Sequence, residues 1–411
     1  MESDETILVT GGSGFLGSYC ILHALKQGYR LRTTVRGLNK SCGIRKALRN
    51  GGATESQANS VQFFVADLNK DDGWEEACAG CDYILHIASP FTIVTPKDEN
   101  ELIAPAKDGT LRVLRAAKKT GTVKRIVVTS SLAAVVFGHD GRAADDPFTE
   151  EDKANLNNPR HRVPAYQKSK IIAEKAAWDF MDKEGGNMEM SVICPCGIFG
   201  PILSSDIAAS LELPLRLLNG TMPGIPNLGL GVVDVRDVAD LHLLAMKHPK
   251  AKGERFIAQS DDQFIWMKEV AAMLRTGLPA VETKKVASWR IPSFMVRIIG
   301  HFDGAVALVA PELGKAKPAS NEKAKEVLGW QPRSSKEAIL SSATSLKEHG
   351  LVKVLLLATL FLQQATPSRA RYPDLSNVLL GPPLVSMPSP LSPMLCYDNS
   401  RLASPLKRPL V

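Results

Sequence analysis

The sequence has few of the features that are typical of disulfide-rich secreted proteins, of proteins stabilised by metal ions, or of membrane-embedded proteins. It holds seven cysteines in 411 residues, which is not the pattern of a disulfide framework in a chain of this length. Cys78 and Cys81 form one close pair, but no second pair and no histidine pair follows at the spacing of a metal site. A marked apolar stretch, Val354–Leu362, is about half the ~20 residues that a membrane-spanning helix needs. We therefore expect reduced thiols, no metal ion and no membrane-embedded body.

The chain also lacks a charge excess in its main part. The formal net charge is +7, and basic proteins are drawn to phosphate. From residue 351 onward, however, six basic residues face only two acidic ones, so the first 350 residues are nearly balanced. The composition, 44% apolar and 23% charged, is that of an ordinary globular protein and excludes a wholly disordered or collagenous one. We expect no nucleic-acid partner.

Short β-branched runs alternate with helical patterns up to residue 194. This alternation is typical of a parallel sheet covered by helices on both faces, and the right-handed crossover rule then predicts an α/β, doubly wound, Rossmann-type fold. The expected strands are Thr6–Thr10, Leu31–Val35, Val61–Ala66, Tyr83–Ile87, Arg125–Thr129 and Met190–Cys194. The expected helices are Phe15–Gln27, a segment after Lys40, Trp74–Ala79, Glu101–Lys119 and Ala165–Lys183.

The pattern changes after Pro195, where proline and glycine become frequent. We predict a dinucleotide-binding lobe at 1–194, a smaller substrate-binding lobe at 195–350, and a disordered or extended Pro-rich tail at 351–411, with a tail anchor left open. In the second lobe we expect strands at Val232–Asp234 and Arg255–Ala258 and helices at Val235–Lys247, Trp266–Leu274, Ser288–Val309 and Ser335–His349.

A glycine-rich loop directly follows the first expected strand and opens the first helix. Gly11 permits a tight turn, Gly14 lets a pyrophosphate approach the backbone, and Gly17 lets the helix pack close to the sheet. The free N–H groups and partial positive charge of the helix N-terminus favour phosphate. The loop predicts a bound dinucleotide.

The end of the second strand indicates which dinucleotide. A carboxylate there would favour NAD, but the strand ends in Val35-Arg36, with Lys40 shortly after. A guanidinium pairs well with a 2′-phosphate, so we predict NADP(H).

After the third strand, Asp67-Leu68 is placed either to reach the adenine edge or to cap a turn. After the fourth, the segment around Ala88 would pass the nicotinamide half.

Tyr166 and Lys170 stand four residues apart at the start of a helix and therefore share a face. A nearby ammonium stabilises phenolate and lowers the pKa of the tyrosine toward working pH, which makes it a usable proton donor or acceptor. Thr129-Ser130-Ser131 ends the fifth strand on the ligand edge, where a serine hydroxyl can hold a carbonyl oxygen. A Tyr-x-x-x-Lys pair alone occurs often by chance, but together with the serine-rich strand end and the glycine loop the combination is specific.

With these motifs, the sequence resembles the extended short-chain dehydrogenase/reductases, and within them the dihydroflavonol 4-reductase-like branch of NADPH-dependent ketone, aldehyde and methylglyoxal reductases. The resemblance covers about residues 5–350. It rests on the glycine loop, Asp67, His86-Ile87-Ala88-Ser89-Pro90, the serine-rich strand end, the Tyr166/Lys170 pair, Arg36, Pro195-Cys196-Gly197, Gly200-Pro201 and Val233–Val238.

The resemblance implies roles for individual residues. Tyr166 would donate the proton, Lys170 would lower the pKa of Tyr166 and bind the nicotinamide ribose, and Ser131, rather than Ser130, would be the catalytic serine. Phe15 and Leu16 would lend backbone N–H groups, and Pro195 would border the nicotinamide. The predicted cofactor-binding set is Gly11, Gly14, Phe15, Leu16, Gly17, Arg36, Lys40, Asp67, Leu68, Ala88, Tyr166, Lys170 and Pro195.

These features predict a cytoplasmic NADPH-dependent reductase, monomeric or homodimeric, that converts a small ketone or aldehyde to an alcohol. No signal peptide or basic leader precedes the first strand, in keeping with that location. Two alternatives of the same superfamily stay open, an epimerase or dehydratase and a steroid-type hydroxyl dehydrogenase. A non-catalytic dinucleotide-sensing regulator is an alternative of another class. Asp234 and Asp237, which flank Arg236, are expected to tie the two lobes together.

Overall fold

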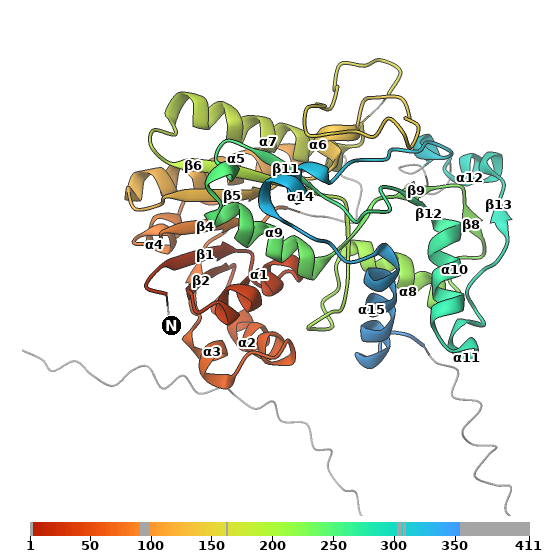
Figure 1. Ribbon diagram of the computed structural model, residues 1–411, viewed down its shortest axis with the longest axis horizontal. Coiled ribbons are helices and arrows are strands. Elements are labelled where there is room, and N and C mark those ends of the chain that lie inside the picture. The colour runs from red at the N-terminus through yellow and green to blue at the C-terminus, as the bar shows by residue number, and fades with distance from the viewer. Residues whose placement is uncertain (1–2, 91–97, 162, 302–305, 307–309, 354–411) are drawn as a thin grey trace, which may run out of the picture. The chain divides into compact units, whose positions relative to one another are not determined.

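A computed structural model describes residues 3–90, 98–161, 163–301, 306 and 310–353 (Figure 1). The apolar run at 354–362 and the Pro-rich tail, about which the sequence makes predictions, lie outside the described residues. Within the described part of the chain, no helix combines the length and the apolar character needed to cross a membrane.

Seven parallel strands form the central sheet, in the order β11-β6-β5-β4-β1-β2-β3. The order reverses between β1 and β4, and this switch point is where doubly wound folds bind ligands. The predicted α/β, doubly wound fold is therefore confirmed. The strands are β1 (Thr6–Thr10), β2 (Arg30–Val35), β3 (Gln62–Val65), β4 (Tyr83–His86), β5 (Arg125–Thr129), β6 (Glu189–Pro195) and β11 (Arg255–Ala258).

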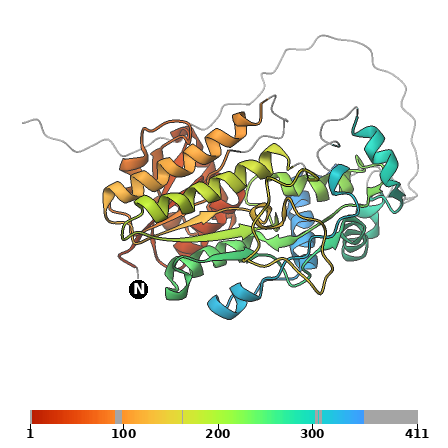
Figure 2. The ribbon, with the colours of Figure 1, turned by 90° about the horizontal axis from the view of Figure 1, so that it is seen from above.

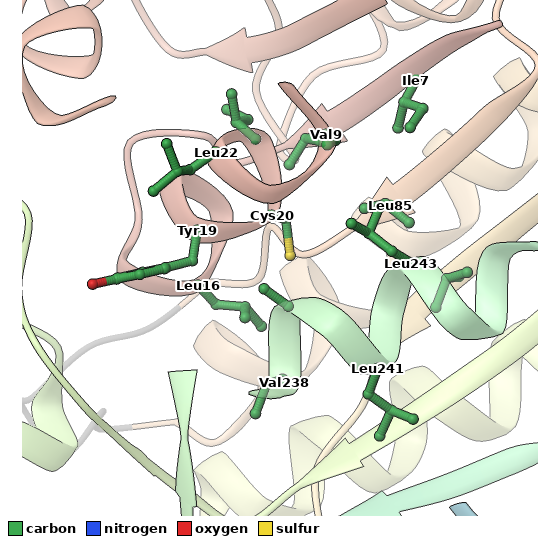
Figure 3. Close-up of a cluster of buried hydrophobic side chains, with 14 of the residues drawn as sticks. Ile7, Val9, Leu16, Tyr19, Cys20, Leu22, Leu85, Val238, Leu241 and Leu243 are labelled. Carbon is green, nitrogen blue, oxygen red and sulfur yellow. The ribbon is translucent and has the colours of Figure 1, made fainter. Parts of the chain in front are cut away.

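Helices cover both faces of this sheet, as the apolar runs of the strands require. On one face lie α1 (Phe15–Lys26), α2 (Ser41–Asn50) and α9 (Val235–Lys247); Figure 3 shows α1, with Leu16, beside α9, which bears Val238. On the other face lie α4 (Trp74–Cys78), α5 (Asn100–Thr120) and α7 (Ala165–Glu184), with α5 and α7 side by side (Figure 2). The short helices α3 (Glu55–Ser60) and α6 (Ala133–Val136) complete this part.

Several elements after β6 build a second core, formed largely by α8 (Glu212–Asn219), α10 (Met267–Gly277) and α15 (Ser335–Glu348). Three small two-stranded sheets accompany them. The strands are β7 (Gly197–Phe199), β8 (Ile225–Pro226), β9 (Gly229–Leu230), β10 (Val232–Asp234), β12 (Ile265–Trp266) and β13 (Arg290–Ile291). The other helices after β6 are α11 (Ala280–Thr283), α12 (Ser293–Ile299) and α14 (Glu322–Leu328), and the buried residues of α14 belong to the core of the main sheet.

The structure differs from two of the predictions for this second part of the chain. The strand Arg255–Ala258 forms as predicted, but it pairs with β6 and extends the main sheet. The prediction of one helix over Ser288–Val309 is wrong in its described part: β13 pairs with β8, and only then does α12 begin. Pro292 explains the break, because the residue before a proline disfavours helical backbone. The predicted boundaries at residues 194 and 350 stay predictions.

Candidate active site

A cavity of about 790 Å³ opens along the carboxyl edge of the sheet. Its wall includes Gly14 and Phe15 of the glycine loop, Ser131 after β5, and Tyr166 and Lys170 of α7. Leu16 and Pro195 also line it. The fold thus brings the two halves of the predicted site, more than 100 residues apart in the sequence, into one hollow.

The glycine loop has the shape that a pyrophosphate site requires. Gly11 adopts a φ of +71°, and its carbonyl accepts the amide of Gly14 at 2.9 Å, which closes a tight turn before α1. A Cβ at Gly17 would overlap that carbonyl oxygen, so the helix can approach the loop only with glycine there. No side chain caps the first turn of α1, whose N-cap is Gly14. These residues fit a dinucleotide, since backbone N–H groups at a helix N-terminus bind phosphate.

Substitutions in this loop should separate cofactor binding from folding. At Gly14 a Cβ would meet only the Gly11 oxygen, at 3.3 Å, so Gly14→Ala should fold normally and weaken NADPH binding about tenfold or more by crowding the pyrophosphate. Gly17→Ala should instead lower the melting temperature, because the backbone must move. Thermal melts with NADPH titration by fluorescence test this pair. Equal loss of stability in both variants would contradict the assignment.

The cations predicted to read the 2′-phosphate lie at the expected edge. Arg36 follows β2 directly, and both Arg36 and Lys40 are exposed. Lys40 lines a smaller hollow, of about 180 Å³, together with Gly12 and Gly14. The second strand is tied to the loop, because the amide of Gly11 donates to Thr34 Oγ1 at 3.3 Å.

The other predicted cofactor residues do not line the main cavity. Asp67 caps a turn, since its Oδ1 accepts the amide of Asn69 at 2.9 Å, which is the alternative that the sequence left open beside adenine binding. Leu68 packs close to Gly109 of α5. Ala88 lies against the glycine loop, for a Cβ at Gly11 would come within 3.1 Å of its Cα. Contacts of these residues with the cofactor stay predictions.

Tyr166 and Lys170 share one face of α7, which begins at Ala165 after Pro164. Burial lowers the pKa of the Lys170 ammonium to about 8, so most of it is protonated at neutral pH. Burial raises the pKa of the Tyr166 phenol. That direction is opposite to the one expected from the sequence, because desolvation of the phenolic oxygen favours the neutral form. A phenol that keeps its proton at neutral pH suits a proton donor.

The structure separates the two serines at the end of β5. Ser130 is buried, and its hydroxyl donates to the carboxylate of Glu174. Ser131 is partly exposed in the cavity wall, and its Oγ accepts the amide of Ala133 at 3.1 Å, which leaves its proton for another acceptor. This geometry favours Ser131 over Ser130 as the group that holds a substrate oxygen.

Sequence reasoning missed two features of the site. Thr10 Oγ1 accepts the amides of Ile87 and Ala88 at 3.0 Å each and contacts His86 Nδ1 at 3.0 Å, and it thereby holds the segment after β4 beside the glycine loop. Burial, with a smaller contribution from the Lys170 charge, lowers the pKa of His86 to about 3, so this imidazole is neutral. The second feature is Glu174, four residues beyond Lys170 on α7. In the sequence, only this four-residue spacing could have indicated it.

The carboxylates expected to tie the two parts of the chain make structural contacts. Asp234 caps α9 by accepting the amide of Arg236 at 2.9 Å, and the Arg236 guanidinium also contacts Asp234 at 2.6 Å and Glu337 at 3.2 Å. Asp237 accepts the amide of Arg333 at 2.6 Å. These bonds join α9 to the segment that leads into α15.

Comparisons with known proteins agree with this geometry. A family model described as the NAD dependent epimerase/dehydratase family matches residues 7–258. The chain is 33% identical to cinnamoyl-CoA reductase CAD2 of Medicago truncatula over 68% of its own length and 82% of that protein. It is 34% identical to dihydroflavonol 4-reductase of Hordeum vulgare over 66% of its length and 75% of that protein.

A solved structure gives the same result for the fold. The crystal structure of yeast methylglyoxal/isovaleraldehyde reductase Gre2 complexed with NADPH superposes with a TM-score of 0.68 at 26% identity. The match covers 84% of this chain and all of the other.

Proposed function

Because the chain belongs to the NAD dependent epimerase/dehydratase family, we propose that it is an NADPH-dependent reductase that converts a ketone or aldehyde to an alcohol. The observation that carries this proposal is the shared cavity. Ser131, Tyr166 and Lys170 line the same hollow as the N-terminal end of α1, so a cofactor phosphate site and a proton donor face one space. The resemblance to the dihydroflavonol 4-reductase-like branch is confirmed by the relatives named above.

The protein is an oxidoreductase and its cofactor is NADP(H). The family model is described as NAD dependent, while the reductase Gre2 was solved with NADPH. Arg36 and Lys40 favour the phosphorylated form, because the end of β2 presents two cations and no carboxylate. The glycine loop would hold the pyrophosphate, and Lys170 the nicotinamide ribose.

When bound, the cofactor supplies the hydride; the chain supplies orientation and the proton. The Ser131 hydroxyl donates a hydrogen bond to the carbonyl oxygen of the substrate and fixes it beside Tyr166. Tyr166 gives its phenolic proton to the same oxygen as negative charge develops there. The Lys170 ammonium then stabilises the phenolate that forms, because a positive charge in a buried site acts with little screening.

A substrate panel tests the proposal. Purified protein should oxidise NADPH, followed by its absorbance, with at least one of a set of ketones, aldehydes and methylglyoxal, and the product should be the matching alcohol. The absence of turnover with every carbonyl compound, together with epimerisation or dehydration of a nucleotide sugar, would replace this function by that alternative. Tight NADPH binding without any turnover would favour the regulator. Location in the cytoplasm and a monomeric or homodimeric state stay predictions.

A further inference from the structure

A buried carboxylate connects the two catalytic segments of the cavity. Glu174 is 4% exposed and lies on α7 at the third position of the series Tyr166, Lys170, Glu174, in which each residue follows the last by four. Residues at this spacing lie on one side of a helix. Its Oε2 accepts the hydroxyl of Ser130 and lies 3.7 Å from Cys194 Sγ.

The other carboxylate oxygen is anchored away from the cavity. Glu174 Oε1 accepts the Arg255 guanidinium at 2.9 Å and Trp178 Nε1 at 3.3 Å. Arg255 also donates to the carbonyls of Glu150, at 2.8 Å, and Asp152. The Glu174 charge is therefore compensated, and its side chain is held from two directions, which fixes the orientation of the oxygen that faces Ser130.

The turn that carries Ser131 is held on both sides. The amide of Ser130 donates to Ile193 at 2.7 Å, and the amide of Leu132 donates to Pro195 at 2.9 Å, so β6 fixes the backbone. The Ser130 hydroxyl adds the bond to α7 through Glu174. Ser131 lies between these anchors and faces the cavity. The Glu174 bond thus joins the turn that bears Ser131 to the helix that bears Tyr166.

We propose that Glu174 is a positioning residue for the proton-transfer site: through Ser130 it sets the place of Ser131 relative to Tyr166. This role rests on the proposed reductase function. A misplacement of about 1 Å in reacting groups lowers turnover about 100-fold while binding persists, so the effect should fall on kcat.

Three variants and one control test the role. Glu174→Gln removes the charge that binds Arg255 and Ser130, Ser130→Ala removes the hydroxyl, and the third variant combines both. Glu189→Gln is the control. Glu189 of β6 pairs with Arg125 of β5 at 2.6 Å, at the amino ends of the two strands whose carboxyl ends hold the turn of Ser130 and Ser131. Arg125 precedes Ser130 by five strand residues, about 16 Å. Each protein is assayed for kcat, KM, NADPH affinity by fluorescence titration, and melting temperature.

We expect Glu174→Gln to lower kcat about 100-fold and Ser130→Ala about tenfold, with NADPH affinity within about threefold of the original protein. The double variant should be no slower than Glu174→Gln, because both changes break one connection. Glu189→Gln should lose stability and keep kcat within about twofold. The role is overturned if Glu174→Gln keeps its kcat, if the two losses multiply, or if Glu189→Gln shows the same loss.

The design separates this inference from the function on which it rests. A normal kcat in Glu174→Gln, with Tyr166→Phe inactive, overturns the positioning role alone. An unsubstituted protein that reduces no carbonyl compound overturns both. Because NADPH binding and melting are measured on every variant, loss of folding is distinguished from loss of positioning.

Discussion

Replacing Tyr166 by phenylalanine is expected to lower kcat by about 1,000-fold or more, with NADPH affinity nearly unchanged. A positioned general acid contributes about 100- to 10,000-fold, and the phenol is the one donor on α7 that the proposed reaction consumes. The aromatic ring stays in place, so the cavity wall keeps its shape. Stopped assays for the alcohol product and fluorescence titration of NADPH measure the two quantities on the same preparation.

Tyr83→Phe serves as the matched control. Tyr83 is the first residue of β4 and therefore lies at the amino edge of the sheet, away from the cavity at the carboxyl edge. Its hydroxyl lies 3.3 Å from a carboxylate oxygen of Glu5. Loss of this hydroxyl removes a hydrogen bond of the scaffold and should leave kcat within about twofold. Near-normal turnover in Tyr166→Phe would remove Tyr166 from the mechanism, whatever the control shows.

The joint variant Arg36→Ala, Lys40→Ala is expected to lose its preference for NADPH over NADH. Hydrogen bonds to charged groups contribute roughly 1.5 to 3 kcal/mol each, so kcat/KM for NADPH should fall about 100-fold or more. The value for NADH, which has no 2′-phosphate, should change only a few-fold. The effect should also shrink at high salt, because both cations are exposed and screened.

Arg30→Ala is the control for this second experiment. Arg30 is an exposed arginine at the first residue of β2, the strand that Arg36 follows, and it pairs with Asp4. Its removal alters net charge by one unit without touching the cofactor edge, so the NADPH preference should persist. If the joint variant kept that preference as well, the basis for reading Arg36 and Lys40 as phosphate ligands would be lost.

Local patterns predicted much of the scaffold. Every strand and helix expected before residue 195 with stated bounds forms with ends within one residue of the prediction, because alternating β-branched runs and helical periods are properties of the neighbouring sequence. The glycine loop was equally visible, since a turn with a φ of +71° at Gly11 requires glycine. The helix expected over Ser288–Val309 is interrupted by Pro292, because a proline disfavours helical backbone at the residue before it.

Contacts between distant residues decided the rest. The sequence could not assign β11 to the main sheet, because strand pairing is set by long-range burial rather than by local pattern. It also gave the wrong direction for the Tyr166 pKa, since desolvation depends on everything packed around the ring.

By itself the sequence determined the sheet-and-helix alternation, the phosphate loop, the cations that follow β2 and the Tyr166/Lys170 pair, all of which lie within short windows of the chain. The resemblance already favoured Ser131 over Ser130, but only the tertiary structure gave the physical reason, since both residues line the cavity. The Ser130 hydroxyl is engaged by Glu174, which lies 44 residues away, and Glu174 is in turn held by Arg255, a further 81 residues on. Burial of polar groups demands such partners, and folding alone determines which distant residues provide them.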